Sequence, residues 1–248
     1  MNILYILWLR QIKKYFRSKA RIIGSLGQPL LFLVALGFGL GPVYQKAGGG
    51  NYLEFLVPGI VAMSIIFTAI FSGIEIIWDK QFGFLKETLV APVSRLKIMF
   101  GRTLGGATVA TLQGLIVMGL SFFLGFKLVN WWSFPLALLF MVLIALLFTA
   151  LGTALASVLN DMQGFQLIIN FLIMPLFFLS GALFPLANLP TAISIATRID
   201  PLTYGVDGLR GALINGAHIG MGLDLLILSL VTLLFIGVGS YLFTRIEI

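Results

Sequence analysis

Long apolar runs alternate with short charged segments along most of this chain. Six of the runs are almost free of charged residues, and each holds about twenty residues or more. A helix rises 1.5 Å per residue, so about 20 apolar residues cross the roughly 30 Å hydrocarbon core of a bilayer. The pattern therefore predicts six membrane-spanning helices, at about 22–41, 54–77, 101–126, 133–159, 163–184 and 222–244.

The continuity of the runs decides between helices and a β-barrel. Barrel strands alternate apolar and polar positions over about 10 residues, whereas these runs are apolar at consecutive positions. A helix also satisfies its own backbone hydrogen bonds in lipid. The predicted fold class is an all-α membrane protein, with 1–248 forming a single transmembrane domain.

Residues 2–20 combine apolar and basic positions in the manner of an amphipathic helix. Apolar residues give a broad face, and Lys13, Lys14, Arg17 and Lys19 supply a polar side suited to anionic headgroups. We expect a helix that lies on the membrane surface. The alternative is a charged flank that only sets the orientation of the chain.

Two segments between the runs carry turn or break signals. Gly41-Pro42 and the residues at 48–51 predict a short external loop over 42–52. The segment 185–219 is too long for a simple turn and too apolar for a solvated loop. We expect two short helices there that dip part-way into the outer leaflet and are broken at Pro201.

Composition supports the membrane interpretation. Apolar residues make up 59% of the chain and charged residues 10%, against about 25% charged in globular domains. The net charge of +7 does not indicate nucleic acid, because the basic residues lie at the ends of apolar runs. The chain has no cysteine, which excludes disulfides and thiol metal sites, and the single His218 cannot form a histidine metal site alone.

The distribution of lysine and arginine predicts the orientation. Twelve of these residues lie on the side that holds both termini and the connection between the second and third runs, and four lie on the other side. The positive-inside rule places the first side in the cytoplasm. We expect a multi-pass protein of the cytoplasmic membrane with both termini inside.

The connection at 78–96 is the one substantial charged segment between the runs. If it is helical, Phe82, Phe84, Leu85 and Leu89 form an apolar strip bordered by charged residues. A short helix with exposed aromatic residues suits insertion into a groove on a partner. The alternative is a solvated loop whose apolar residues lie back on the membrane, and the residue pattern alone does not separate the two.

Motifs for chemistry are missing from the sequence. It contains no G-x-x-x-x-G-K-[ST] phosphate loop, no H-E-x-x-H and no G-x-S-x-G, so we do not expect this chain itself to be an enzyme. Carboxylates are few in the predicted spans, with Glu54 and Glu75 at opposite ends of one span and Asp224 near the outer end of another. An ion-coupled secondary transporter, the alternative function, needs ionisable groups near mid-span. A membrane-embedded enzyme or a scaffold is a third class, with no visible cluster to support it.

Three stretches resemble one family. The segment from Asp79 to Arg95 resembles the cytoplasmic signature of type-2 ABC exporter permeases, with a charged pair, Gly, Leu-x-Glu and a Pro-x-Ser-Arg end. The stretch 178–190 is similar to the family's fifth-span ending. The stretch 200–211 resembles its external motif, although Asp200 and Asp207 stand where the family often has Asn and Glu. The matches follow the family order and spacing, nearest to the drug-resistance and nodulation-factor export group.

The resemblance implies a permease subunit of an ATP-driven exporter. It implies a separate ATP-binding subunit in two copies, which holds ATP and Mg, and a second copy of this chain. The segment 80–91 would be the coupling helix, 2–20 the interface helix, and 185–215 an external re-entrant hairpin. Implied cargoes are drugs, lipids and lipid-linked glycans. No cofactor is expected in this chain, and lipid is its other partner.

The same resemblance assigns candidate site residues. Those for ATPase coupling are Asp79, Lys80, Phe82, Gly83, Phe84, Leu85, Lys86, Glu87, Thr88, Leu89, Pro92 and Arg95. Those for the external gate are Pro185, Asp200, Pro201, Leu202, Thr203, Tyr204, Asp207 and Arg210.

Several of these residues have two possible roles. Glu87 can contact the ATPase or cap local structure, and Arg95 can pair with Glu87 or Asp79 or bind lipid phosphates. Tyr204 and Arg210 can line the exit or hold the hairpin together.

Glycines and buried amides give smaller expectations. Gly83 is expected to allow a turn before the coupling helix. Gln113 and Asn170 are expected to make interhelical hydrogen bonds, and Gly105-Gly106 indicates close helix packing.

Overall fold

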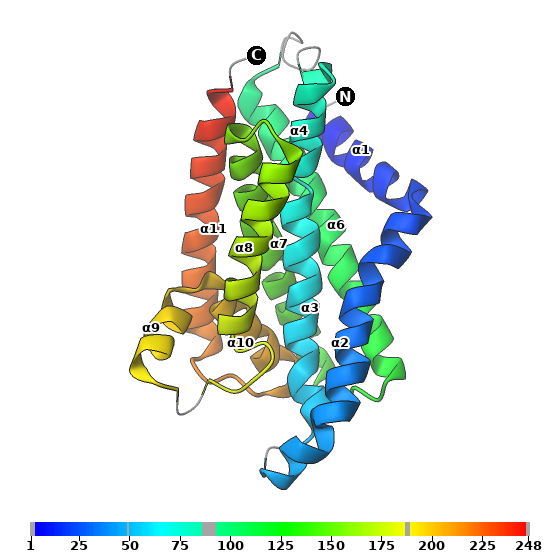
Figure 1. Ribbon diagram of the computed structural model, residues 1–248, viewed down its shortest axis with the longest axis vertical. Coiled ribbons are helices and arrows are strands. Elements are labelled where there is room, and N and C mark those ends of the chain that lie inside the picture. The colour runs from blue at the N-terminus through cyan, green and yellow to red at the C-terminus, as the bar shows by residue number, and fades with distance from the viewer. Residues whose placement is uncertain (1–2, 49, 86–92, 187–188, 247–248) are drawn as a thin grey trace.

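The computed structural model describes residues 3–48, 50–85, 93–186 and 189–246, and all regular structure in these ranges is helical (Figure 1). The elements are α1 (Ile3–Arg17), α2 (Lys19–Lys46), α3 (Tyr52–Phe71), α4 (Ile74–Gln81), α6 (Arg95–Phe123), the 3-10 turn η1 (Trp131–Ser133), α7 (Phe134–Val158), α8 (Met162–Leu179), α9 (Thr191–Ile199), α10 (Pro201–Ile214) and α11 (Met221–Thr244).

Six helical segments in the described part of the chain are long and apolar enough to cross a membrane. They are Lys19–Lys46, Tyr52–Gln81, Arg95–Phe123, Trp131–Val158, Met162–Leu179 and Met221–Thr244. The predicted all-α fold class with six spans is therefore confirmed. Several spans are longer than predicted, because their helices continue into the charged flanks that marked the ends of the apolar runs.

Two predicted boundaries are wrong. The external loop expected from residue 42 begins later, because α2 continues through Gly41-Pro42 and the Ala47 N–H still bonds to the Val43 carbonyl at 3.1 Å. A proline removes only its own N–H from the helix, and such prolines are tolerated in spans. The fifth span ends at Leu179 and not at 184, because Gly181 adopts a left-handed backbone with φ +73°.

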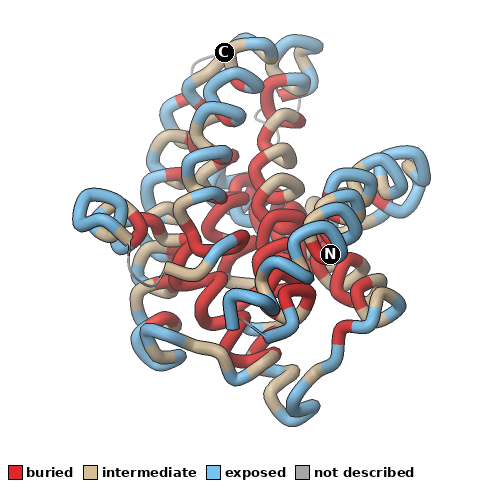
Figure 2. The backbone as a smooth tube through the Cα atoms, turned by 60° about the horizontal axis from the view of Figure 1, so that its bottom comes forward, coloured by how far each residue is buried: buried red, intermediate tan, exposed pale blue. Residues whose placement is uncertain are grey.

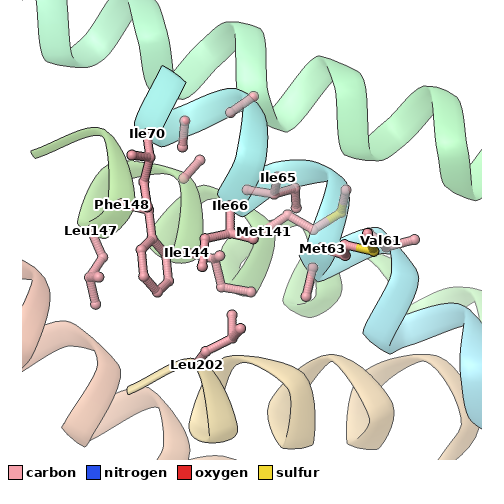
Figure 3. Close-up of a cluster of buried hydrophobic side chains, with 14 of the residues drawn as sticks. Val61, Met63, Ile65, Ile66, Ile70, Met141, Ile144, Leu147, Phe148 and Leu202 are labelled. Atoms are coloured by element: carbon pink, nitrogen blue, oxygen red, sulfur yellow. The ribbon is translucent and has the colours of Figure 1, made fainter. Parts of the chain in front are cut away.

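The core lies around α3, the most buried span, which packs among α2, α6, α7, α8 and α10. Figure 3 shows α3 side chains interleaved with those of α7 and with Leu202 of α10. Buried residues gather in the middle of the bundle, while the outer helices expose apolar surface (Figure 2). Glycines allow the closest approach: a Cβ on Gly73 would lie 2.5 Å from the carbonyl oxygen of Gly152 on α7.

The N-terminal helix α1 packs lengthwise against α6. A Cβ on Gly101 would lie 2.9 Å from the Leu7 Cβ, and one on Gly105 would lie 2.7 Å from the Gln11 Cβ. The Trp8 indole N–H donates to the Thr108 hydroxyl at 3.0 Å. One face of α1 is therefore covered by protein, and the placement of this helix at the membrane surface stays a prediction.

The pair α9 and α10 lies at the end of the bundle opposite both termini (Figure 1). The two expected short helices are present, and their break falls at Asp200-Pro201. The Asp200 carboxylate accepts the Leu202 N–H at 2.9 Å and caps α10, whose first residue is Pro201. Proline at the first helical position lacks an N–H that would have no partner in the helix.

Candidate functional site

The connection between the second and third spans is shorter than the predicted 78–96. Residues 78–81 belong to α4 and α6 begins at Arg95, so the connection comprises 82–94. Phe82 and Phe84 are 70% and 56% exposed, whereas Leu85 is buried. Gly83 has φ +79°, which confirms the expected turn. The predicted residues Lys86, Glu87, Thr88, Leu89 and Pro92 lie outside the described residues.

Lys80 joins the end of α4 to the end of α7. Its ammonium donates to the carbonyls of Ser157 at 2.7 Å and Leu159 at 3.2 Å. It also donates to the Asn160 side chain at 3.3 Å. The last carbonyls of a helix have no partner within the helix and carry partial negative charge, so a cation there is stabilising.

Asp79 and Arg95 join the connection to two further spans. Asp79 accepts from Arg102 on α6, and the Arg95 guanidinium donates to the carbonyls of Thr244 at 2.7 Å and Ile246 at 3.0 Å. The proposed pairing of Arg95 with Asp79 is therefore wrong. Arg102 lies two turns further along α6, level with Asp79, while Arg95 reaches the end of α11. We call Asp79, Lys80 and Arg95 the anchors, since these residues flank the connection in α4 and α6 and hold its two ends to α6, α7 and α11.

At the opposite end, Arg210 holds the outer helix pair to the bundle. It is buried, and it donates to the carbonyls of Phe55 at 3.3 Å and Gly181 at 2.9 Å. Its guanidinium lies 4.0 Å from the centroid of the Phe55 ring. Burial lowers the pKa of Arg210 to about 10, which is still high enough to keep the group charged at neutral pH. These contacts join α10 to α3 and to the turn after α8.

Tyr204 and Asp207 also make contacts within this end of the molecule. The Tyr204 hydroxyl donates to the Arg198 carbonyl at 2.7 Å. Asp207 accepts the backbone N–H groups of His218 at 3.0 Å and Ile219 at 2.8 Å, which fixes the connection from α10 to α11. For Tyr204 and Arg210 the contacts favour the holding role over the exit-lining role.

The remaining residues of the external motif have different surroundings. Leu202 and Thr203 are buried, and Leu202 belongs to the core in Figure 3. Pro201 begins α10, and Pro185 is half-buried in the segment after α8. Asp224, fully buried at the start of α11, lies beside Asp207.

A charge cluster at Glu75 was missed by reasoning from sequence. The Glu75 carboxylate on α4 pairs with the Lys14 ammonium at 3.0 Å and the Arg21 guanidinium at 3.3 Å. A lone carboxylate near the end of a span, with a basic segment before the first span, was the available signal. The predicted bond of Gln113 is confirmed: its carbonyl accepts from the Tyr15 hydroxyl at 2.5 Å. Burial raises the pKa of Tyr15, so the phenol stays a donor.

Beside this cluster a cavity of about 260 Å³ opens between α2 and α3. Arg21, Ser25 and Gln28 line it from α2, and Phe67, Thr68 and Phe71 line it from α3. The α2 wall therefore carries the charged and amide groups, and the α3 wall carries two phenylalanine rings beside the hydroxyls of Ser64 and Thr68.

Outward-facing amides mark the faces of two spans. Gln163, Gln166 and Asn170 follow one face of α8 and are exposed, as is Gln28 on α2. The interhelical hydrogen bond expected of Asn170 is therefore not found among the described residues. A polar side chain that faces hydrocarbon is unfavourable, and polar groups in spans usually face protein or a water-filled path. In the described part of the chain no three His, Asp or Glu side chains come together to hold a metal.

The sequence of this chain is similar to a known family of membrane proteins. A family model described as "ABC-2 type transporter" matches residues 3–214. Nodulation protein J of Rhizobium leguminosarum bv. trifolii is 32% identical over 83% of this chain and 76% of its own length. Nodulation protein J of Rhizobium meliloti (strain 1021) is 30% identical over 83% and 79%. A chain of Cyanophora paradoxa named as transport permease ycf38 is 31% identical over 84% and 72%.

Proposed function

This chain belongs to the ABC-2 type transporter family, and from that premise we propose that it is the permease subunit of an ATP-driven exporter. The family and its named relatives make the chain a multi-pass transport permease and not itself an enzyme. The proposal adds that a separate ATP-binding subunit supplies the energy. It also adds that an amphipathic molecule, such as a drug, a lipid or a lipid-linked glycan, leaves across the cytoplasmic membrane.

The observation that carries the proposal is the anchored connection. Phe82 and Phe84 are exposed at its start, and Asp79, Lys80 and Arg95 tie its two ends to α6, α7 and α11. Exposed aromatic residues on a short segment suit a groove on another protein. A displacement of this segment is transmitted to three spans through charge-assisted hydrogen bonds. The geometry therefore supports a docking site through which an ATP-binding subunit moves the helices.

A second copy of the chain completes the proposed transporter. The amides of α8 are exposed on the outside of that helix, where lipid gives them no hydrogen-bond partner. A pathway between two copies supplies water and polar partners for these groups. ATP binding draws the two ATP-binding subunits together and rocks the spans through the connection, and hydrolysis resets them.

The test is co-purification with a hydrolysis assay. We would purify the tagged chain in detergent from its native cells and measure the ATPase activity of what accompanies it. The proposal expects a stoichiometric ATP-hydrolysing partner that is lost in a Phe82→Ala, Phe84→Ala double variant. Trp132→Ala is the matched control, since Trp132 is 92% exposed at the other end of the bundle.

Two outcomes contradict the proposal. A chain that purifies alone, with no hydrolysis, points to an ion-coupled transporter. A partner that binds the double variant as well as the wild type removes the connection as the docking point.

A further inference from the structure

The cavity between α2 and α3 has the shape and lining of a small binding site within the spans. Arg21 and Gln28 are seven residues apart on α2, which is two helical turns or about 10 Å. Ser25 lies between them on the same face. At Gly24, which also lines the cavity, a Cβ would have nothing within 4 Å, so the space continues up to the backbone of α2.

The polar wall of the cavity carries an excess of positive charge. Lys14 and Arg21 share the single carboxylate of Glu75, so one positive charge at the cluster is not compensated. The Arg21 side chain is 38% exposed and lines the cavity, while Lys14 lies outside it. The Tyr15 hydroxyl already donates to Gln113, which leaves the Arg21 guanidinium and the Gln28 amide as the strong donors toward a ligand. This wall suits an anion.

The opposite wall suits a hydrocarbon chain. Phe67 and Phe71 lie one turn apart on α3, with ring centroids 6.4 Å apart and nearly parallel planes. Further along the same span α2 exposes Leu31, Val34 and Phe38, so apolar surface is available near the cavity for the rest of a chain. Drug-sized ligands occupy pockets of about 300–1,000 Å³. A cavity of about 260 Å³ therefore holds a headgroup and the first part of a chain, with the rest in lipid.

We propose that this cavity is the loading site for a single-chain amphipath with an anionic headgroup. Arg21 and Gln28 bind the headgroup, and Phe67 and Phe71 bind the beginning of the chain. The inference rests on the proposed exporter function for its direction of transport, and it narrows the cargo from amphipathic molecules in general to acidic ones. The binding itself needs neither ATP nor the partner subunit.

The test compares two probes that differ only in charge. The chain, in nanodiscs of phosphatidylcholine, would be titrated with radiolabelled oleoyl lysophosphatidate or with monooleoylglycerol. We expect saturable binding of the phosphate probe and only weak binding of the neutral one. Arg21→Gln should weaken binding of the phosphate probe about tenfold, as expected for the loss of one hydrogen bond to a charged group.

Two matched controls distinguish effects on the cavity from effects on its surroundings. Lys14→Gln also removes one cation from Glu75 and lowers the net charge of the cluster by the same amount, but it leaves the Arg21 donor in the cavity, so it should weaken binding less than Arg21→Gln does. Gly24→Leu fills the cavity and should abolish binding. Gly39→Leu makes the same change on α2 at a glycine whose Cβ also has nothing within 4 Å, and it should leave binding intact.

Equal binding of both probes, or equal affinities in Arg21→Gln and Lys14→Gln, would overturn the site. Reconstitution with the ATP-binding subunit distinguishes a transported cargo from a lipid that stays bound in the cavity. A cargo moves to the opposite leaflet when ATP is added, whereas retention of the probe contradicts the loading role. A complex that hydrolyses ATP normally but binds no lysophosphatidate would contradict this inference without contradicting the proposed exporter function.

Discussion

Asp200 caps α10 from a buried position, and that position sets its protonation. Burial raises the pKa of this carboxyl from 3.8 to about 7, although the hydrogen bond from the Leu202 N–H favours the charged form. The folded state therefore disfavours the carboxylate relative to the unfolded chain. The resulting loss of stability is absent below about pH 4 and grows as the pH rises to about 7.

We expect Asp200→Asn to reduce this pH dependence. Asparagine keeps an oxygen that can accept the Leu202 N–H, but it does not ionise. The midpoint of thermal unfolding, measured in detergent at pH 5 and pH 8, should fall with pH in the wild type and fall less in the variant. Equal pH dependence in the two proteins would show that Asp200 does not bear the burial penalty.

At the scale of elements, the contact between α1 and α6 depends on glycine. Gly105→Ala places a methyl group 2.7 Å from the Gln11 Cβ, so α1 has to shift. We expect the free energy of unfolding to fall by about 1–3 kcal/mol, the usual cost of overpacking. Gly119→Ala on the same helix is the control, because its Cβ has nothing within 4 Å. Thermal unfolding in detergent compares them, and equal midpoints would contradict tight packing of α1.

A second prediction at this scale concerns Lys80. Replacing it with glutamine removes the ammonium that joins α4 to the end of α7. We expect ATP to move α7 less in this variant, while the partner subunit still hydrolyses ATP. Lys97→Gln is the control, since Lys97 is an exposed lysine near the same connection. The readout is the distance between spin labels at position 158 in two copies, with and without ATP. An undiminished ATP-dependent change in Lys80→Gln would remove Lys80 from the coupling path.

The sequence predicted elements better than it predicted pairings. Apolar runs mark spans because a continuous apolar run crosses lipid as a helix, which satisfies its own backbone hydrogen bonds. Gly105 marked close packing because only a small residue lets another helix approach so closely. The partner of Asp79 was not predictable. Arg95 and Arg102 are seven residues apart on one face of α6, so the choice depends on how the helix ends are staggered. An amphipathic pattern in α1 fits a membrane surface and a protein groove equally well.

At the scale of the whole molecule, the orientation is open to a direct test. The chain has no cysteine, so a single introduced cysteine can be labelled without background. We expect an impermeant maleimide to label Ala47→Cys in intact cells and Ser94→Cys only after permeabilisation. Both positions are exposed, at opposite ends of the bundle. The reverse labelling pattern would contradict the cytoplasmic placement of the termini.

The packing of α1 on α6 has a consequence for synthesis. Trp8 and its partner Thr108 are separated by 100 residues. At roughly 5–20 residues per second, the ribosome needs about 5–20 seconds to make the interval between them. During that time α6 is not yet there to cover the apolar face of α1, and this face can be buried in the membrane surface instead. The nascent helix thus begins on lipid and transfers to protein once the third span has been inserted.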